Sequence, residues 1–361
     1  AKSTTRDTYE AEARFIRAFG HFCIVSEFGA APLCLEKLES VSDVYAADIR
    51  VPKADIYQAI VDDCEWIAKS PLTDFQPASM CGKTCKVAAY ALEGKALLQQ
   101  ATDPDFASQK AELCGKAITA LTNAWNKKTF AKLEDISVTD AWDMATQKGS
   151  KENIFQINFI AKNADLGSDF AYIYGPMADA NITSKHLCQN SSMTNKAFYD
   201  TYEAADARKA FLRKTTYGGI DYYHSMKFKD LDCGTDGYGG NNWIVLRYAD
   251  VVLMLAEAYY WDGNESEAKV WLNKVRERAG LGAWNGTDLR QGIYDERLKE
   301  FIHEGHSWHD YLRRYNAEEM VAHFQAVNPN FSIKDLLFPI PYSERILNPE
   351  GLPQNPGYLG E

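Results

Sequence analysis

Three histidines toward the C-terminal end of the chain have a spacing that could suit a metal ion. His303, His306 and His309 lie three residues apart, with Glu304 beside the first of them, and could share one face of a helix. Imidazole is a common zinc ligand, but the HExxH pattern of zinc proteases places its two histidines four residues apart. We therefore expect these histidines to have a structural role.

A second group of possible ligands consists of the carboxylates Asp230, Asp232 and Asp236, which precede Gly237. In a calcium loop, oxygens at alternate positions converge on the cation. Here Gly234 stands at the third oxygen position, and no glutamate closes the loop. We expect a polar turn, with a calcium site as the open alternative and no other cofactor.

The eight cysteines do not complete a metal site. Cys81 and Cys85 have a four-residue spacing, but no second pair accompanies them. Cys23, Cys64 and Cys114 fall within helical patterns, where a free cysteine usually packs as a small hydrophobic residue. The cysteines are therefore expected to be structural.

The usual motifs of nucleophilic catalysis and phosphate binding are absent from the sequence. It has no GxSxG elbow, and its Gly-rich stretches GGIDYYH and YGGNNW contain neither GxxxxGK[ST] nor GxGxxG. A pair of acid/base carboxylates is not identifiable by spacing alone, because distant carboxylates meet only in the fold. We predict a binding protein and not an enzyme.

Composition narrows the class of partner. The 361 residues carry a formal net charge of −11, which argues against binding to a phosphate backbone. The sequence has no run of 18 apolar residues that could span a bilayer as a helix. Tyr, with 20 residues, is more numerous than Phe (17) or Trp (8). A Tyr ring with its hydroxyl suits polar ligands with an apolar face, such as sugars, although helical cores also use Tyr.

Apolar residues at helical spacing predict four helices in the first third of the chain, at about residues 8–27, 52–69, 83–102 and 104–125. The break at Asp103 and Pro104 is short, so the third and fourth helices should form an antiparallel hairpin. The fourth is expected to bury a stripe that consists of Ala107, Ala111, Cys114, Ile118 and Leu121.

From residue 127 to 242 the helical pattern disappears. Residues 153–160 are the best strand candidate, and the remainder is rich in Gly, Asn, Ser and Tyr. Loops held on a rigid scaffold commonly carry binding residues, so we predict the ligand contacts here, although several rings could instead fill gaps beneath their own loops. The predicted ligand-binding residues are Tyr172, Tyr174, Tyr217, Tyr222, Tyr223, Tyr238, Asn241 and Asn242.

Regular spacing returns after residue 247. In this segment small and aromatic residues are followed by a turn at Gly and then by a Glu-Ala pair, and this order resembles a tetratricopeptide repeat. The residues that carry this order are Leu255, Ala258, Tyr259, Gly263, Ala268, Leu272 and Val275. Such helical hairpins expose an apolar face unless they stack, so the sequence predicts a packed helical array. Helices at about 288–303 and 308–315 and a Pro- and Asn-rich tail follow.

Four segments, in this order, resemble the SusD/RagB family of outer-membrane nutrient-binding lipoproteins. EARFIRAFGHFCIVSEFGAAPL is similar to an early helix of the family, and LRYADVVLMLAEAYYWDGNESEAKVWLNKVRERAGL to its late repeat. DERLKEFIHEGHSWHDYLRR and FPIPYSERILNPEGLPQNPGY are similar to two motifs near its end. One departure is Ser307, which stands where the family usually has Arg before Trp308.

The resemblance implies a mainly α, SusD-like fold in which tetratricopeptide-like hairpins pack with a loop-rich region. We expect one compact unit with three consecutive parts: helical hairpins at 1–126, the ligand-binding region at 127–243, and the late repeat with its tail at 244–361. Trp243, directly before the repeat, is expected to anchor it in the core.

The same resemblance implies a cell-surface protein of polysaccharide utilisation and nutrient uptake. It would bind oligosaccharides without catalysis and deliver them to a SusC-like TonB-dependent transporter. A lipid attached upstream of Ala1 would hold it at the outer membrane. The alternatives are a peptide or another nutrient as the ligand, as in RagB-like relatives, and a repeat scaffold that binds only protein.

Overall fold

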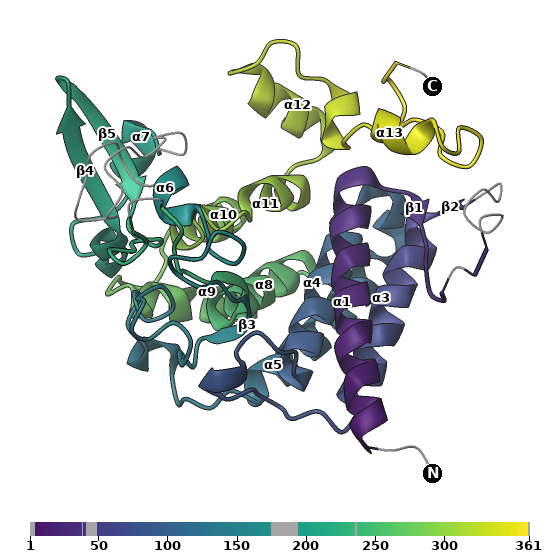
Figure 1. The fold of residues 1–361 in the computed structure, drawn as a ribbon. Coiled ribbons are helices and arrows are strands. Elements are labelled where there is room, and N and C mark those ends of the chain that lie inside the picture. The colour runs from purple at the N-terminus through teal and green to yellow at the C-terminus, as the bar shows by residue number, and fades with distance from the viewer. Residues whose placement is uncertain (1–3, 38, 41–48, 175–193, 235–236, 360–361) are drawn as a thin grey trace. The chain divides into compact units, whose positions relative to one another are not determined.

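The computed structural model describes residues 4–37, 39–40, 49–174, 194–234 and 237–359. Helices dominate this part of the chain, and its strands form small two-stranded antiparallel sheets (Figure 1). The mainly α fold predicted from the sequence is confirmed. None of the described helices combines the length and the apolar character needed to cross a bilayer.

The helices, in chain order, are α1 (Thr4–Phe28), α3 (Lys53–Ala68), α4 (Lys86–Thr102), α5 (Lys110–Asn126), α6 (Phe170–Tyr174), α7 (Lys196–Tyr199), α8 (Tyr248–Trp261), α9 (Glu265–Arg278), α10 (Leu289–Glu300), α11 (Ser307–Arg314), α12 (Ala317–Gln325) and α13 (Tyr342–Arg345). The strands are β1 (Ala31–Pro32), β2 (Arg50–Val51), β3 (Asn153–Ile157), β4 (Leu212–Tyr217), β5 (Ile220–Ser225) and β6 (Trp243–Arg247).

Two compact units share the chain, and each is discontinuous in sequence. Unit 1 comprises Ala1–Leu72, Leu92–Ala120 and Trp308–Glu361, and unit 2 comprises Thr73–Ala91 and Leu121–Ser307. The boundaries fall within α4 and α5, so both helices contribute residues to each unit. The division into three consecutive parts stays a prediction.

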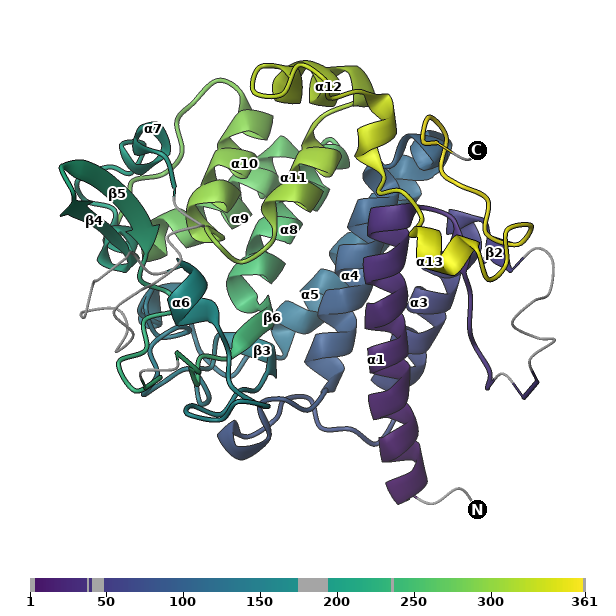
Figure 2. The ribbon, with the colours of Figure 1, turned by 45° about the horizontal axis from the view of Figure 1, so that its top comes forward.

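In unit 1, α1 and α3 pack side by side (Figure 2). The buried face of α3 is the apolar stripe read from the sequence: Ile56, Ile60, Cys64 and Ile67, each 0% exposed. Asp63 on α3 is also buried, because it accepts hydrogen bonds from Arg14 and Arg17 of α1 at 2.6–2.8 Å. This charge pairing fixes how α1 lies along α3.

The buried face of the fourth predicted helix differs from the expected stripe. Cys114 and Leu121 are buried as predicted, but Ala107 and Ala111 are exposed. Residues Pro104–Gln109 form a 3-10 turn with a kink at Phe106, so α5 begins only at Lys110. Phe106 itself is buried and packs edge-on against Tyr57. Because Phe106 buries more apolar area than an alanine does, it, and not Ala107 or Ala111, determines which side of this segment faces the core.

Unit 2 contains the predicted late repeat as the antiparallel pair α8 and α9 (Figure 2). Gly263 makes the turn with a φ of +85°, and the Asn264 side chain caps α9 by accepting from the Glu267 N–H. The inward residues Leu255, Ala258, Ala268, Leu272 and Val275 are all 0% exposed. The predicted packing of this repeat is confirmed.

The strand candidate at 153–160 forms a shorter strand than expected. β3 ends at Ile157 and pairs antiparallel with β6, with Gln156 opposite Ile244 and Ile157 opposite Trp243. Register shifts interrupt this pairing near Phe155, so Ile154 and Phe155 are both buried. Residues 158–160 are therefore outside the strand, contrary to the prediction.

The sequence analysis missed the hairpin of β4 and β5. Tyr217 pairs with Ile220 across Gly218 and Gly219, whose φ values are +57° and +80°. Positive φ at both central residues is the geometry of a type I′ turn, which matches the twist of the flanking strands. The sequence Tyr-Gly-Gly-Ile between runs of Thr and Tyr was the signal that could have revealed it.

Candidate functional site

Unit 2 contains a cavity with a volume of about 620 Å³. Its wall combines apolar and charged side chains from three stretches of the chain, residues 139–144, 210–211 and 226–232. The lining residues are Thr139, Trp142, Asp143, Met144, Ala210, Phe211, Met226, Lys227, Lys229, Asp230, Leu231 and Asp232. This mixture of rings, methionines and carboxylates can meet both the apolar faces and the hydroxyls of a polar ligand.

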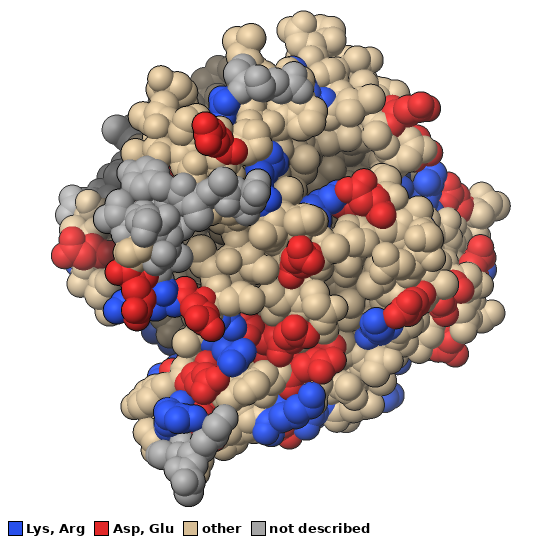
Figure 3. Space-filling view, turned by 90° about the vertical axis from the view of Figure 1, so that its right-hand side faces the viewer, with Lys and Arg blue, Asp and Glu red and all other residues tan. Residues whose placement is uncertain are grey.

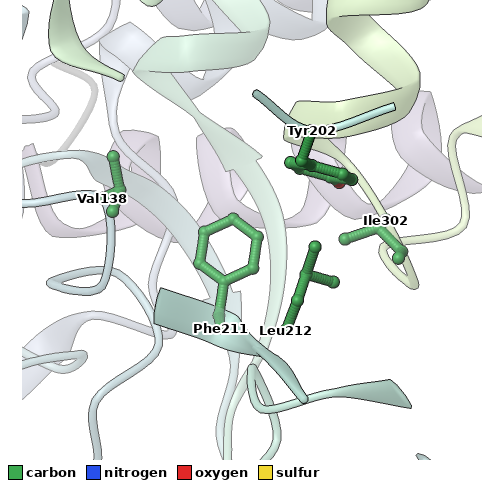
Figure 4. Packing of buried hydrophobic residues seen from close by; sticks show 5 residues of the cluster. All are labelled: Val138, Tyr202, Phe211, Leu212 and Ile302. Carbon is green, nitrogen blue, oxygen red and sulfur yellow. The ribbon is translucent and has the colours of Figure 1, made fainter. Parts of the chain in front are cut away.

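The β4–β5 hairpin begins and ends at this cavity. Phe211 directly precedes β4 and Met226 directly follows β5, and the Met226 N–H donates to the Phe211 carbonyl at 2.6 Å. Phe211 belongs to a core cluster with Val138, Tyr202, Leu212 and Ile302, and Met226 packs against this cluster (Figure 4). The cavity wall is therefore held by packed residues.

A second cluster, of Ala141, Trp142, Phe228 and Ile244, also contributes a residue to the cavity wall, Trp142. Trp142 packs edge-on against Phe228, with the ring centroids 5.3 Å apart, and Phe228 stacks on Trp243 at 5.8 Å. Trp142 lines the cavity but is only 6% exposed, so most of its area is buried in the core. Trp243, expected as an anchor of the repeat, is half-buried in this cluster.

Lys227 is a buried cation in the cavity wall. Its Nζ donates to the Glu300 carbonyl at 2.6 Å and to the Glu304 carboxylate, and it lies 4.7 Å from the Phe211 ring centroid and 5.2 Å from that of Trp142. Burial lowers the pKa of Lys227 to about 8, although Glu304 opposes that shift. The ammonium thus lies within cation–π distance of both rings.

Lys227 belongs to a buried ion-pair network that the sequence analysis did not identify. Arg247 bonds Glu152 and Glu300 at 2.7 Å and Glu304 at 2.8 Å, and Arg278 pairs with Glu152 at 2.8 Å. Burial opposes ionisation of Glu300, but Arg278 and Arg247 hold the pKa of its carboxyl well below the usual range.

The network explains one of the motifs read from the sequence. Glu296, Glu300 and Glu304 recur every four residues in DERLKEFIHEGH, and each of them is at most 4% exposed. Glu296 and Glu300 share one face of α10, and Glu304 lies in the turn that follows the helix. Their partner arginines come from other elements. The i, i+4, i+8 spacing of these acids was the signal in the sequence that could have revealed the network. The same spacing is also typical of a solvent-exposed helix face.

The predicted tyrosines have different environments. Tyr217 at the hairpin tip is 51% exposed, and Tyr222 on β5 is half-buried opposite Thr215. Tyr223 is only 7% exposed and packs against the Tyr199 ring at 4.8 Å. Within the hairpin, Tyr217 and Tyr222 are thus accessible to a ligand, whereas Tyr223 fills the core of its own strand pair.

Tyr172 and Tyr174 lie on the short helix α6, and both are half-buried. The Tyr174 ring stacks between Phe228 and His303, at centroid distances of 4.8 and 4.9 Å. Burial raises the pKa of the Tyr174 hydroxyl. Both faces of this ring are therefore in contact with protein, and only its edge is open to other contacts.

The last three predicted residues lie in the irregular segment that precedes β6. Tyr238 is half-buried, and its carbonyl accepts from the Lys162 N–H at 2.8 Å. Asn241 and Asn242 are 1% and 0% exposed. The Asn242 amide donates to Gln156 and Asn158 and accepts from the Phe159 N–H, so it joins the ends of β3 and β6. Neither asparagine reaches the surface in this structure.

Each of the three histidines has its own aromatic neighbour. His303 stacks on Tyr174, His306 stacks on Phe301 at 4.4 Å, and the His309 ring lies 6.5 Å from that of Phe22. Burial lowers the pKa of His303 and of His309 to about 4. These contacts fit the structural role expected from the sequence.

The carboxylates of the possible calcium loop are engaged within the protein. Asp230 is buried and accepts from the N–H groups of Asp232 and Gly240, both at 2.7 Å, while Asp232 pairs with Lys162. Asp236 lies outside the described residues. Among the described residues, no group of three His, Cys, Asp or Glu side chains is arranged to hold a metal ion.

On the face of the molecule shown in Figure 3, acidic and basic side chains lie next to one another and broad areas between them carry no charge.

Comparison with known proteins places the chain in a family. SusD-like protein P2 of Formosa agariphila is 27% identical over an alignment that covers 96% of this chain and 74% of that protein. SusD-like protein P25 of the same organism is 25% identical, with 94% and 70% covered.

Solved structures share the fold. A SusD superfamily protein from Parabacteroides distasonis superposes with a TM-score of 0.79 at 23% identity, covering 99% of this chain and 80% of that one. Surface glycan-binding protein A from Bacteroides uniformis gives 0.78 at 21%, with 98% and 79% covered. The SusD family model matches residues 139–358, more than half of the 361. The chain therefore belongs to the SusD family, as its motifs predicted.

Proposed function

We propose that this protein binds oligosaccharides at the cell surface and passes them, uncleaved, to a SusC-like TonB-dependent transporter. Membership of the SusD family supports a nutrient-binding role. The name of its structural relative from Bacteroides uniformis, surface glycan-binding protein A, supports a glycan as the ligand. A lipid anchor upstream of Ala1 would hold the protein at the outer membrane, beside the transporter.

The observation that carries the proposal is the cavity at the base of the β4–β5 hairpin. Its volume of about 620 Å³ lies within the range of about 300–1,000 Å³ that is common for small-molecule sites. Trp142, Phe211 and Met226 supply apolar surface for the faces of sugar rings. Asp143 and Lys229, both exposed at the cavity, supply an acceptor and a donor for hydroxyls.

The hairpin extends this site beyond the cavity. Tyr217 and Tyr222 present accessible rings along β4 and β5, on the segment that the cavity residues Phe211 and Met226 anchor. An oligosaccharide is longer than one ring, so we propose that one unit enters the cavity while neighbouring units stack on these tyrosines. Of the three predicted tyrosines on the hairpin, these two are the more exposed, whereas Tyr223 is buried.

The proposed function does not require a cofactor. Recognition by rings, hydroxyl partners and shape needs no metal, and the side chains of Asp230 and Asp232 already have partners within the protein. Calcium binding stays an open prediction for this loop, and elemental analysis of the purified protein in calcium-containing buffer is its test.

A glycan array, with a peptide library run alongside, identifies the ligand class. The best ligand is then titrated calorimetrically into the wild type and two variants. Leu231→Ala removes an exposed apolar side chain (53%) at the cavity, and Val270→Ala removes one of similar exposure (50%) on α9 as the matched control. We expect weaker binding for Leu231→Ala alone. A response to peptides only, or equal loss in both variants, would contradict the proposal.

A further inference from the structure

Unit 2 contains a second cavity, of about 210 Å³. This volume exceeds the roughly 150 Å³ of a cavity that holds a benzene ring and is below the range of about 300–1,000 Å³ that is common for larger ligands. The cavity therefore suits a ligand of one ring. Its lining residues, none of which lines the cavity at the hairpin, are Phe75, Gln76, Pro77, Ala78, Cys81, Thr129, Lys148, Gly149, Ser150, Lys151, Asn153 and Ile154.

The charge of this wall is positive. Lys148 and Lys151 are the charged residues among those that line the cavity, and both are exposed. Neither of them forms an ion pair with a described residue. The chain as a whole has a net charge of −11, so a wall whose charged residues are two lysines differs in sign from the rest of the protein.

The acids that neighbour the lining residues in sequence already have cationic partners. Asp74 pairs with Lys127 at 2.8 Å. Glu152 is 0% exposed and pairs with Arg247 at 2.7 Å and with Arg278 at 2.8 Å. These carboxylates are therefore committed elsewhere, and the positive charge at the cavity is left for an anionic group of a ligand.

A buried acceptor lies in the same wall. Asn153 is 3% exposed, and its amide nitrogen donates to the carbonyls of Ala141 at 3.1 Å and Gln147 at 3.0 Å. These two bonds fix which side of the amide carries the oxygen, and the Asn153 Oδ1 atom has no hydrogen-bond partner among the described residues. Native proteins rarely leave a buried acceptor unsatisfied. A ligand hydroxyl is a donor of the kind that this oxygen lacks.

We propose that this cavity binds one unit of an acidic sugar, with the anionic group between Lys148 and Lys151 and a hydroxyl of the same ring donating to Asn153 Oδ1. Hydrogen bonds from ammonium groups to an anion are stronger than neutral ones. Phe75 and Pro77 add apolar surface for the face of the ring. A uronic acid and a sulfated sugar share this chemistry. The proposal goes beyond the function proposed for the hairpin and does not depend on it.

Four soluble probes, titrated calorimetrically, separate the two requirements and identify the source. D-Glucuronate carries a carboxylate and hydroxyls, and D-glucose 6-sulfate carries a sulfate ester and hydroxyls. D-Glucose lacks the charge, and cyclohexanecarboxylate lacks the hydroxyls. We expect at least one acidic sugar to bind about tenfold more tightly than both incomplete probes, and the tighter of the two acidic sugars names the source. If neither acidic sugar exceeds the incomplete probes, the proposal is wrong.

Lysine substitutions locate the effect. The double variant Lys148→Gln/Lys151→Gln should lose about tenfold or more in affinity for the acidic sugar. Lys196→Gln/Lys269→Gln removes the same charge from exposed positions on α7 and α9 and should bind as tightly as the wild type. Melting curves of both variants confirm folding. Equal losses in the two variants would assign the effect to the overall charge of the protein and would overturn the proposal.

Two further measurements separate this cavity from the hairpin. Leu231→Ala should bind the acidic sugar as tightly as the wild type, whether or not the hairpin binds an oligosaccharide; a loss in this variant would place the acidic sugar at the hairpin and contradict the proposal. Wild-type affinity should also fall as salt is added, because exposed lysines are screened, and Lys148→Gln/Lys151→Gln should show a smaller salt dependence. The same salt dependence in both proteins would assign the attraction to other charges and would overturn the proposal.

Discussion

The α8–α9 repeat and the β4–β5 hairpin are each a pair of antiparallel segments joined at glycine, yet they expose their side chains very differently. Every residue from Tyr248 to Ala258 in α8 is buried. In the hairpin, Tyr217 and Ile220 beside the turn are 51% and 59% exposed. One element has its apolar area committed to the protein interior, and the other presents apolar area to solvent.

This difference separates the residues that hold the fold from those available for contact with a ligand. The repeat follows directly on β6, whose Arg247 is the centre of the buried ion-pair network. The hairpin is held at its base by Phe211 and Met226 and along β5 by Tyr223, which packs against Tyr199, while its tip has no such contact with a core cluster of described residues. We expect substitutions in the first region to change stability and substitutions at the hairpin tip to change binding.

The largest effect is expected at Arg247. Arg247→Ala leaves Glu152, Glu300 and Glu304 with one cation fewer in an environment that excludes water, which should cost about 3–5 kcal/mol of unfolding free energy. Denaturant unfolding measures it. Lys214→Ala, which removes a solvent-exposed partner of Asp221, is the control and should change stability by less than about 1 kcal/mol. Similar losses in both would contradict the distinction.

The buried histidines should make stability fall in acid. The folded pKa values of His303 and His309 are about 4, below the unfolded value near 6.5, so the unfolded state binds more protons between these pH values. Stability is therefore lost as the pH falls from about 6.5 to 4, by up to about 3 kcal/mol for each histidine. Unfolding measured at several pH values checks this slope.

His303→Asn sharpens the same prediction. His303 has a φ of +62°, a conformation that Asn tolerates well, so the substitution removes the titrating ring without imposing backbone strain. The acid slope should become shallower in this variant, while its stability at pH 8 falls because the stacking on Tyr174 is lost. An unchanged slope would assign the acid sensitivity to other groups.

A smaller loss is expected inside the repeat at Ala268. This residue is 0% exposed where α9 packs against α8, so Ala268→Leu should overpack the contact and cost about 1–3 kcal/mol. Val270→Leu, on the exposed side of the same helix, should leave the melting temperature nearly unchanged. Equal melting temperatures for the wild type and Ala268→Leu would contradict the close packing of this pair.

The smallest effect on stability belongs to the hairpin tip. Tyr217→Ala should change the unfolding free energy by no more than about 0.5 kcal/mol, because half of the ring is in solvent. Oligosaccharide affinity should fall roughly two- to tenfold, since one stacking surface is lost. Tyr217→Phe retains the ring and should retain most of the affinity. A stability loss with unchanged affinity would place Tyr217 with the scaffold.

The helices could be predicted because their buried apolar residues recur at helical spacing along the sequence. Ile56, Ile60, Cys64 and Ile67 recur with helical spacing, and the small residues of the late repeat mark where two helices approach. The phase of α5 could not be predicted, because the kink at Phe106 depends on a partner, Tyr57, that lies far away in sequence. The family motifs identified the SusD family.

The site was less accessible to prediction than the fold. The sequence indicated the correct tyrosine-rich segment, but exposure separates Tyr217 from Tyr223 only after the hairpin is formed. Trp142, Phe211 and Lys227 were not singled out, because the cavity gathers them from separate segments and none has a local motif. The acids of the ion network look like a solvated helix face until their arginines are placed beside them.

One titration tests the central claim, that the cavity and hairpin bind an oligosaccharide without cleaving it. The best array ligand is titrated calorimetrically into the wild type and Leu231→Ala, and the recovered ligand is then analysed by mass spectrometry. We predict saturable wild-type binding with a Kd in the range of about 1 μM to 1 mM, weaker binding to Leu231→Ala, and ligand of unchanged mass. Shortened sugars, or the same Kd for both proteins, would contradict the account.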